Sequence, residues 1–203
     1  MSDLLRGLRF FERLRVVHFD MKPANILISS SLRLKIGDFG LMKSLDDKYA
    51  GPRGTYRFCS PELFAAEFGD FKADVFATGI VLYELLTLHH PFITAYDEQH
   101  NPNLQSNHDA TNRRAWREVI ISHPLIHLRP HICTIDPAVT ALIEEMLIKR
   151  HSDRPLASKI LSSHFLINNV PELYQREQFA KQAAAEERMA HLAEENEVST
   201  LFF

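Results

Sequence analysis

The chain has 203 residues, of which 45% are hydrophobic and 24% are charged, values typical of a soluble globular domain. The formal net charge of −3 at pH 7 argues against a nucleic-acid-binding protein, which usually carries a basic excess. Two cysteines, Cys59 and Cys133, are too few for a disulfide framework. They favour a reducing compartment, so we expect a cytoplasmic protein, with the nucleus as an alternative.

No membrane anchor is expected from the apolar pattern. The longest apolar stretch, residues 76–88, contains Glu84 and is too short to span a bilayer, so it predicts a buried helix. The arginine-rich first fifteen residues could also indicate a transit peptide, but Asp3 and Glu12 weigh against that alternative.

The first predicted elements are a helix and a hairpin. Apolar residues at helical spacing indicate a helix over residues 4–15, with Ser2 or Asp3 as its N-cap. Two short apolar runs follow, residues 25–28 and 32–36, separated by three serines that are typical of a turn.

The rest of the chain predicts helices joined by loops. Residues 41–61 lack a sustained period and indicate an ordered loop, and residues 97–113 are polar and indicate a surface loop. Helices are expected over residues 74–88, 116–122, 137–149, 157–161 and 171–196. The expected fold is therefore mainly α with a small β-hairpin, in a domain of residues 1–170 followed by a charged helical tail, residues 171–203.

Polar side chains gather where the first helix meets the hairpin. The segment His18-x-Asp20-x-Lys22-x-x-Asn25 places a carboxylate, an ammonium and an amide within eight residues. A carboxylate can orient or deprotonate a hydroxyl, and a lysine can offset negative charge on a transferring phosphoryl group. Asp38 stands across the hairpin from Asn25, and together their oxygens could hold Mg²⁺.

These residues also occur in the order and spacing of a known family. His18 to Asn25 resembles the catalytic loop of protein kinases, and Asp38-Phe39-Gly40 resembles the kinase metal-binding motif. The resemblance implies that Asp20 is the catalytic base and that Lys22 contacts the γ-phosphate of ATP. It also implies that Asn25 and Asp38 bind Mg²⁺ and that Leu27 forms the floor of the adenine site.

Further segments resemble the same family, so that the likeness covers about residues 4–167. Residues 54–62 are similar to the end of the activation loop, and the resemblance places the Thr55 hydroxyl against the catalytic Asp20. Asp74, at the start of the family's central helix, would brace the catalytic loop. Arg154 would pair with Glu62. His18, Phe39 and Gly40 have structural roles in the same comparison, and Lys22 with Thr55 indicates Ser/Thr rather than Tyr specificity.

The sequence departs from the kinase pattern in three places. No Gly-x-Gly-x-x-Gly occurs, and the first helix already matches the one before the catalytic loop, so we expect only the C-terminal lobe of the fold. Phe19 replaces a common arginine, so that phosphorylation of Ser44 or Tyr49 would not act as the usual switch. Drift in a degenerate kinase is an equally weighted explanation of Phe19. Residues 93–118 form a long insert in which a metal site is less favoured than a solvated loop.

Three functions follow from these patterns. The leading hypothesis is an ATP- and Mg²⁺-dependent protein kinase acting on Ser/Thr hydroxyls of a protein substrate. A non-catalytic scaffold, with residues 171–203 docking a partner, is the alternative, and a truncated gene fragment is a third. A simpler reading, in which Asp20, Asn25 and Asp38 are only turn and cap residues, is disfavoured by five motifs in register.

Overall fold

The computed structural model describes residues 2–93, 104, 110–125 and 137–162. The chain divides into two compact units, Met1–Leu161 and Ser162–Phe203, and only the first contains enough described residues for an account of its fold. The expected boundary at residue 170 and the expected tail helix lie outside the described residues. The same is true of most of the insert, including His100 and His108.

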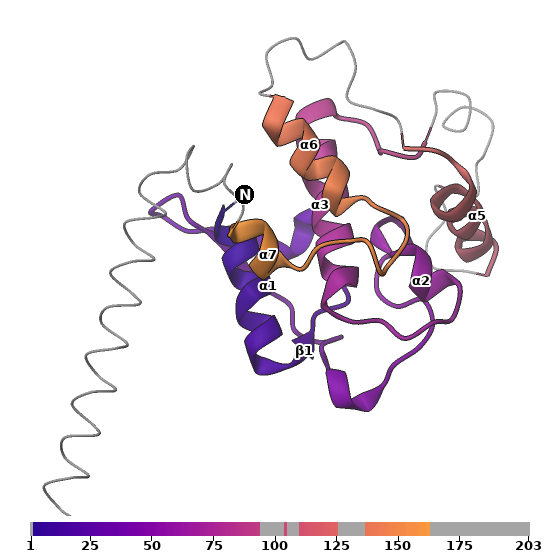
Figure 1. The fold of residues 1–203 in the computed structure, drawn as a ribbon, viewed down its shortest axis with the longest axis horizontal. Coiled ribbons are helices and arrows are strands. Elements are labelled where there is room, and N and C mark those ends of the chain that lie inside the picture. Colours follow the sequence, from indigo (N-terminus) through magenta and orange to yellow (C-terminus); the bar gives the residue numbers. More distant parts are fainter. Residues whose placement is uncertain (1, 94–103, 105–109, 126–136, 163–203) are drawn as a thin grey trace, which may run out of the picture. The chain divides into compact units, whose positions relative to one another are not determined.

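The described part is mainly helical, with two small antiparallel sheets (Figure 1). The prediction of a mainly α fold with a hairpin is therefore confirmed, and one further sheet is added. Six α-helices are described: α1 Ser2–Leu14, α2 Pro61–Phe64, α3 Phe71–Thr87, α5 Ala110–Ser122, α6 Pro137–Met146 and α7 Ala157–Leu161. The strands are β1 Val16–Val17, β2 Ile26–Ile28, β3 Leu34–Ile36 and β4 Lys43–Ser44.

Helix α1 buries one apolar face, as its spacing predicts. Leu4, Leu5 and Leu8 are almost fully buried, and the helix packs against α3 and α7. The helix already begins at Ser2, so Ser2 and Asp3 lie within its first turn and are not its N-cap. Asp3 instead binds Arg33 at the start of β3, with Nε of Arg33 2.9 Å from Oδ2 of Asp3. This contact ties the hairpin to α1.

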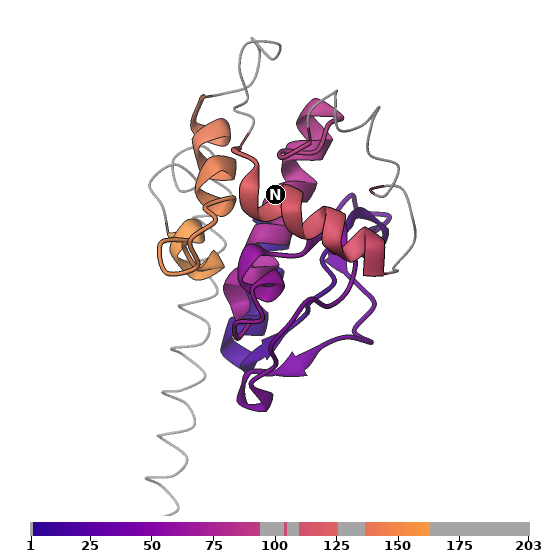
Figure 2. The ribbon, with the colours of Figure 1, turned by 90° about the vertical axis from the view of Figure 1, so that its right-hand side faces the viewer.

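Helix α3 lies at the centre of the described fold, because most of its surface is apolar (Figure 2). It begins at Phe71, three residues before the predicted start. Asp70 explains the difference, since its Oδ1 accepts a hydrogen bond of 2.8 Å from the backbone N–H of Lys72 and caps the helix. None of the helices among the described residues has the length and apolarity needed to cross a bilayer.

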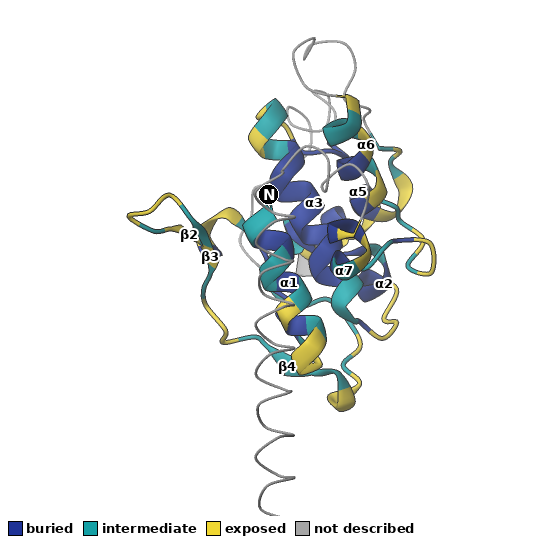
Figure 3. Ribbon diagram, turned by 60° about the vertical axis from the view of Figure 1, so that its left-hand side comes forward, coloured by how far each residue is buried: buried dark blue, intermediate teal, exposed yellow. Residues whose placement is uncertain are grey.

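The strands form two separate pairs at the periphery. β2 pairs with β3 in the register Ile26↔Ile36, and this hairpin projects from the helices with exposed residues on both strands (Figure 3). β1 pairs with β4, which lies within the predicted loop of residues 41–61. That loop also contains two 3-10 turns, Leu45–Asp47 and Tyr56–Phe58.

Two other predicted boundaries shift. α5 begins at Ala110, inside the predicted surface loop, and α6 ends at Met146 rather than at residue 149. The buried guanidinium of Arg154 binds the backbone that follows α6. Its Nε donates to the carbonyl of Ile148 over 2.8 Å, and its Nη2 donates to the carbonyl of Lys149 over 3.2 Å. These two bonds satisfy carbonyls that have no partner within α6.

Candidate active site

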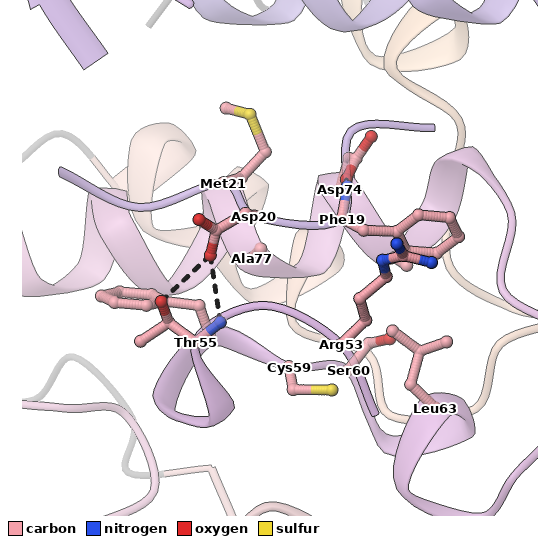
Figure 4. Close-up of a pocket in the computed structure, with 12 residues that line it drawn as sticks. Phe19, Asp20, Met21, Arg53, Thr55, Cys59, Ser60, Leu63, Asp74 and Ala77 are labelled. Carbon is pink, nitrogen blue, oxygen red and sulfur yellow. Dashed lines mark hydrogen bonds between the residues drawn. The ribbon is translucent and has the colours of Figure 1, made fainter. Parts of the chain in front are cut away.

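The Asp20 carboxylate is the centre of the candidate site, because three other polar residues contact it. Its Oδ1 accepts hydrogen bonds of 3.0 Å from both the backbone N–H and the Oγ1 of Thr55 (Figure 4). Its Oδ2 lies 2.6 Å from Nζ of Lys22 and 3.0 Å from Nδ2 of Asn25. Lys22 Nζ also donates to Thr55 Oγ1 over 3.1 Å. The structure therefore brings together all four residues expected to be catalytic.

The contacts to Asp20 determine its charge. Burial pushes the pKa of this carboxyl upward, but the hydrogen bonds from Lys22 and Thr55 outweigh burial and leave the pKa below its ordinary value. Asp20 is therefore an ionised carboxylate at neutral pH. Such a group can accept a hydrogen bond from an incoming hydroxyl and orient its oxygen.

Asp74 on α3 holds the backbone that carries Asp20. Its Oδ2 accepts from the N–H of His18 over 2.7 Å, and its Oδ1 accepts from the N–H of Phe19 over 2.9 Å. These bonds fix Phe19 at a φ of 63°, a left-handed conformation that is uncommon for a bulky residue. Burial raises the pKa of Asp74 to about 7, against the opposing effect of the two backbone bonds.

Gly54 allows two segments of the chain to approach each other. We call residues 41–62 the activation segment and residues 18–25 the catalytic loop, after the kinase elements that they resemble. The φ of Gly54 is 70°, and a Cβ placed there would lie 2.3 Å from the carbonyl oxygen of Phe19 and 2.8 Å from Oδ1 of Asp20. No side chain fits in that space. The residue before Thr55 must therefore be glycine for Thr55 to reach Asp20.

Asp38 follows Gly37 at the end of the hairpin, where Gly37 N–H donates to the carbonyl of Asn25 over 2.8 Å. The turn here does not use a left-handed glycine, because the positive φ of 57° falls on Asp38 itself. An aspartate tolerates this conformation by bonding locally, and Oδ1 of Asp38 accepts from Gly40 N–H over 3.3 Å. Gly37 is needed for a different reason, since a Cβ there would lie 3.2 Å from Leu27 Cδ1.

The pair Asn25 and Asp38 fits a magnesium site in its donor chemistry. Both bonds from Nδ2 of Asn25 go to Asp20, one to its carbonyl over 2.8 Å and one to its Oδ2, so the amide oxygen is turned away from that residue. Mg²⁺ prefers hard oxygen ligands and usually keeps several waters, so one amide and one exposed carboxylate are an adequate set. Among the residues that the structure describes, no cluster of three or more His, Cys, Asp or Glu side chains could hold a metal.

An aromatic cluster formed by Phe11, His18 and Phe39 packs next to the turn at Asp38. The ring of Phe39 lies edge-on to the rings of His18 and Phe11. The distances between ring centroids are 5.8 Å to His18 and 6.2 Å to Phe11. Nε2 of His18 is 3.0 Å from the carbonyl oxygen of Gly37, and Nδ1 accepts from the N–H of Asp20 over 3.2 Å. Burial lowers the pKa of His18, which agrees with a neutral ring in this arrangement. His18 thereby connects the Asp20 backbone with the Asp38 turn.

Glu62 and Arg154 form a bidentate ion pair on the far side of the activation segment. Nη1 of Arg154 lies 2.8 Å from Oε1 of Glu62, and Nη2 lies 3.0 Å from Oε2. Burial raises the pKa of Glu62, but the two bonds from Arg154 outweigh burial and leave it below its ordinary value. The pair connects α2 to the loop before α7.

Phe19 makes an aromatic contact with the activation segment. Its ring lies 5.6 Å from that of Tyr49, and a Cβ at Gly69 would lie 2.7 Å from its Cε1. The guanidinium of Arg53 also stacks on the Tyr49 ring, with Cζ 4.6 Å from the ring centre. Ser44, the other residue considered above for phosphorylation, accepts a hydrogen bond of 3.3 Å at its Oγ from Asp46 N–H. Phe19 therefore contacts the segment through apolar packing.

Sequence reasoning missed a second charged pair, which begins two residues after Thr55. Arg57, in the 3-10 turn after Thr55, binds Glu84 near the end of α3, with Nη2 2.6 Å from Oε1. Glu84 is the single charged residue in the apolar run of residues 76–88, and that isolation could have signalled a partner. The partner itself could not be identified from the sequence, because the two residues are far apart along the chain.

Comparison with known proteins agrees with this geometry. A family model of the protein kinase domain matches residues 1–166. The chain is 39% identical over 98 residues to a probable serine/threonine-protein kinase PknB of Bifidobacterium longum, covering 45% of this chain and 14% of the relative. It is 38% identical over 99 residues to the serine/threonine-protein kinase PknB of Mycolicibacterium smegmatis, covering 46% of this chain and 16% of the relative.

A vertebrate relative gives a similar result. The proto-oncogene serine/threonine-protein kinase mos of Rattus norvegicus is 39% identical over 95 residues, covering 44% of this chain and 28% of the relative. The matched part of the chain thus spans less than a third of the length of each of these relatives. Because the family model matches most of the sequence, the chain belongs to the protein kinase domain family.

Proposed function

We propose that this chain provides the catalytic loop and the protein-substrate site of an ATP-dependent protein serine/threonine kinase. One observation carries the proposal: the ionised carboxylate of Asp20 is held by Thr55, Lys22 and Asn25 within a single hydrogen-bonded cluster. The names of the relatives, all serine/threonine-protein kinases, support the same activity.

In the proposed reaction Asp20 orients the Ser or Thr hydroxyl of the substrate and accepts its proton. A bond forms between that hydroxyl oxygen and the γ-phosphorus of ATP, while the bond from the γ-phosphorus to the β,γ-bridging oxygen breaks and ADP leaves. The proton passes from Asp20 to solvent after transfer. Lys22 supplies positive charge where negative charge develops on the transferring group.

Thr55 has two functions in this proposal. Its backbone and hydroxyl fix the rotamer of Asp20, and its contact with Lys22 joins the activation segment to the catalytic loop. A side chain held at both carboxylate oxygens loses little further freedom when the substrate binds, which favours catalysis. Thr55 and Lys22 are also the residues that support Ser/Thr rather than Tyr substrates.

Asn25 and Asp38 would hold the magnesium ion, which neutralises charge on the phosphates of ATP when it is bound. Leu27, whose Cδ1 would lie 3.2 Å from a Cβ at Gly37, offers an exposed apolar surface on the neighbouring strand for the adenine ring. In this proposal the described elements correspond to the C-terminal lobe of the kinase fold. A cover over the phosphates is then provided by other protein segments.

Nucleotide binding tests the proposal directly. Because a ligand that binds only the folded state stabilises it, millimolar Mg-ATP should raise the melting temperature of the protein in its full natural length. Asp38→Asn should remove this rise, whereas Asp153→Asn, at an exposed carboxylate of the loop before α7, should retain it. An equal rise in Asp38→Asn, or none in the wild type, would contradict the assignment and favour a non-catalytic scaffold.

A further inference from the structure

Tyr49 of the activation segment lies between two side chains from different parts of the chain. The centre of its ring is 5.6 Å from that of Phe19 in the catalytic loop, with 59° between the ring planes. Cζ of Arg53 lies 4.6 Å from the centre of the same ring. A tilted pair of rings and a guanidinium over a ring both attract through the ring quadrupole. We call Phe19, Tyr49 and Arg53 the Tyr49 cluster.

Both neighbours of Tyr49 are closely packed where they meet it. Phe19 is only 7% exposed, and a Cβ at Gly69 would lie 2.7 Å from its Cε1. Nε of Arg53 is buried and has no hydrogen-bond partner among the residues that the structure describes. A buried donor without a partner is costly, and an aromatic face offsets part of that cost as a weak acceptor. Tyr49 thus supplies a contact that the side chain of Arg53 otherwise lacks.

The Tyr49 cluster adjoins the residues that hold the catalytic carboxylate. Phe19 directly precedes Asp20, and Arg53 is two residues before Thr55. Phe19 and Arg53 also line the same small cavity as that carboxylate (Figure 4). Phe19 meets the activation segment a second time at its carbonyl oxygen, which would lie 2.3 Å from a Cβ at Gly54. Moving this part of the segment away from the catalytic loop would therefore break the cluster and the bonds to Asp20 together.

The cluster places its cation on the activation segment. With Phe19 where many kinases have an arginine, the catalytic loop offers an aromatic ring at this point and no positive charge. The positive charge belongs to Arg53, and the face of the Tyr49 ring lies between the two. Neither contact includes a phosphate group. The segment is therefore held against the catalytic loop in the unmodified chain.

We propose that Tyr49 and Arg53 are positioning residues that hold Thr55 against Asp20 without phosphorylation of the activation segment. This inference rests on the proposed function where it concerns catalysis, since it takes Asp20 as the group that orients the acceptor hydroxyl. The ring face of Tyr49 carries the effect and its hydroxyl does not, because the hydroxyl's bond to the carbonyl of Pro52 is long, at 3.4 Å.

Five variants test which features of the cluster matter. Tyr49→Leu keeps an apolar side chain but removes the ring face, and Arg53→Gln keeps a polar side chain but removes the charge. Tyr49→Phe keeps the ring and is the conservative variant. Lys48→Gln removes an exposed cation one residue before Tyr49 and is the charge-matched control. Ile160→Val, on the buried face of α7, lowers the overall stability at a distance in the chain and is the control for stability.

Exchange of the Thr55 amide proton reports the position of the segment, because this N–H donates to Oδ1 of Asp20. Hydrogen-exchange NMR uses the protein in its full natural length after phosphatase treatment, with a mass that shows no remaining phosphate. We expect Tyr49→Leu and Arg53→Gln each to speed this exchange about tenfold, which corresponds to about 1.4 kcal/mol. The other three variants should exchange as the wild type does.

Phosphate transfer to a serine peptide gives the second readout. Tyr49→Leu and Arg53→Gln should lower kcat about tenfold and leave the KM for Mg-ATP unchanged, because none of the contacts described for the cluster reaches Asn25 or Asp38. Since both substitutions break the same contact, the double variant should lose less than the two single losses combined. An unchanged kcat in both single variants of an active protein would overturn the positioning role.

The two readouts separate this proposal from the one on which it rests. Faster Thr55 exchange in Tyr49→Leu and Arg53→Gln would support the positioning role even if no phosphate were transferred, an outcome that would overturn the kinase activity alone. The positioning proposal is overturned if either variant exchanges as the wild type does, or if Ile160→Val speeds the exchange equally. It is also overturned if Tyr49→Phe behaves like Tyr49→Leu, or if Thr55 is unprotected in the phosphate-free wild type.

Discussion

Arg154 and Glu62, 92 residues apart in the chain, form a fully enclosed bidentate ion pair whose side chains are 0% and 2% exposed. The same guanidinium also binds the carbonyl of Lys72 on α3 over 2.8 Å and the two carbonyls that follow α6. One side chain thus connects the end of the activation segment, the central helix and the loop before α7. It has no contact with Asp20 among the bonds described above, so it stabilises the site indirectly.

Breaking this pair should therefore be costly. Glu62→Gln leaves the buried guanidinium without its counter-charge, and we expect a loss of about 3–5 kcal/mol in the free energy of unfolding. Urea denaturation followed by circular dichroism measures it. Arg150→Ala, at an exposed pair, is the control and should cost well under about 1 kcal/mol. A loss for Glu62→Gln that is no larger than the control would contradict the structural role assigned to the pair.

His151 and Asp70 should make stability depend on pH. Nε2 of His151 lies 2.9 Å from Oδ1 of Asp70, and this bond raises the pKa of His151 above its ordinary value. A histidine whose pKa is raised on folding adds stability at a pH below its unfolded pKa, and this stability is lost as the pH rises through the folded pKa. His151→Gln should thus destabilise the protein more at pH 5.5 than at pH 8.5, as measured by urea denaturation. An equal effect at both values would show that folding does not raise the pKa of His151.

Gly54 offers a test of the close approach between the activation segment and the catalytic loop. Gly54→Ala should cost about 1–3 kcal/mol from its positive φ together with the clash against Phe19 and Asp20, and it should displace Thr55. Gly51→Ala is the matched control, because Gly51 also has a positive φ, 104°, but nothing lies within 4 Å of its added Cβ. Both variants should lose some stability in thermal unfolding. Only Gly54→Ala should also abolish phosphoryl transfer, and equal activity in the two variants would contradict the account.

Asp74 should be required for the geometry of the catalytic loop. In Asp74→Asn the amide nitrogen cannot accept a hydrogen bond, so one of the N–H groups of His18 and Phe19 is left unpaired in a buried position. We expect a loss of about 1–3 kcal/mol and faster exchange of these two amide protons, which hydrogen-exchange NMR can follow. Unchanged exchange at both positions would show that Asp74 does not hold this backbone.

Much of the fold could be predicted from local patterns. The apolar stripe of α1, the hairpin and the central helix α3 follow from short-range periodicity, so only their ends were misplaced. The ends depend on individual contacts between side chains and backbone, such as the Asp70 cap at the start of α3, and apolar periodicity does not indicate them. The same limit applies to the site. The spacing from His18 to Asp38 indicated the cluster, but the turn at Asp38 and the partner of Glu84 required coordinates.

Transfer of labelled γ-phosphate from ATP to a protein substrate tests the central claim most directly. The measurement compares the wild-type protein, in its full natural length and with Mg²⁺, with Asp20→Asn, followed by identification of the phosphorylated amino acid. The asparagine keeps the shape of Asp20 but is not basic, so we expect transfer to fall by about 100-fold or more and the label to lie on serine or threonine. Wild-type rates in Asp20→Asn, or label on tyrosine alone, would contradict the account.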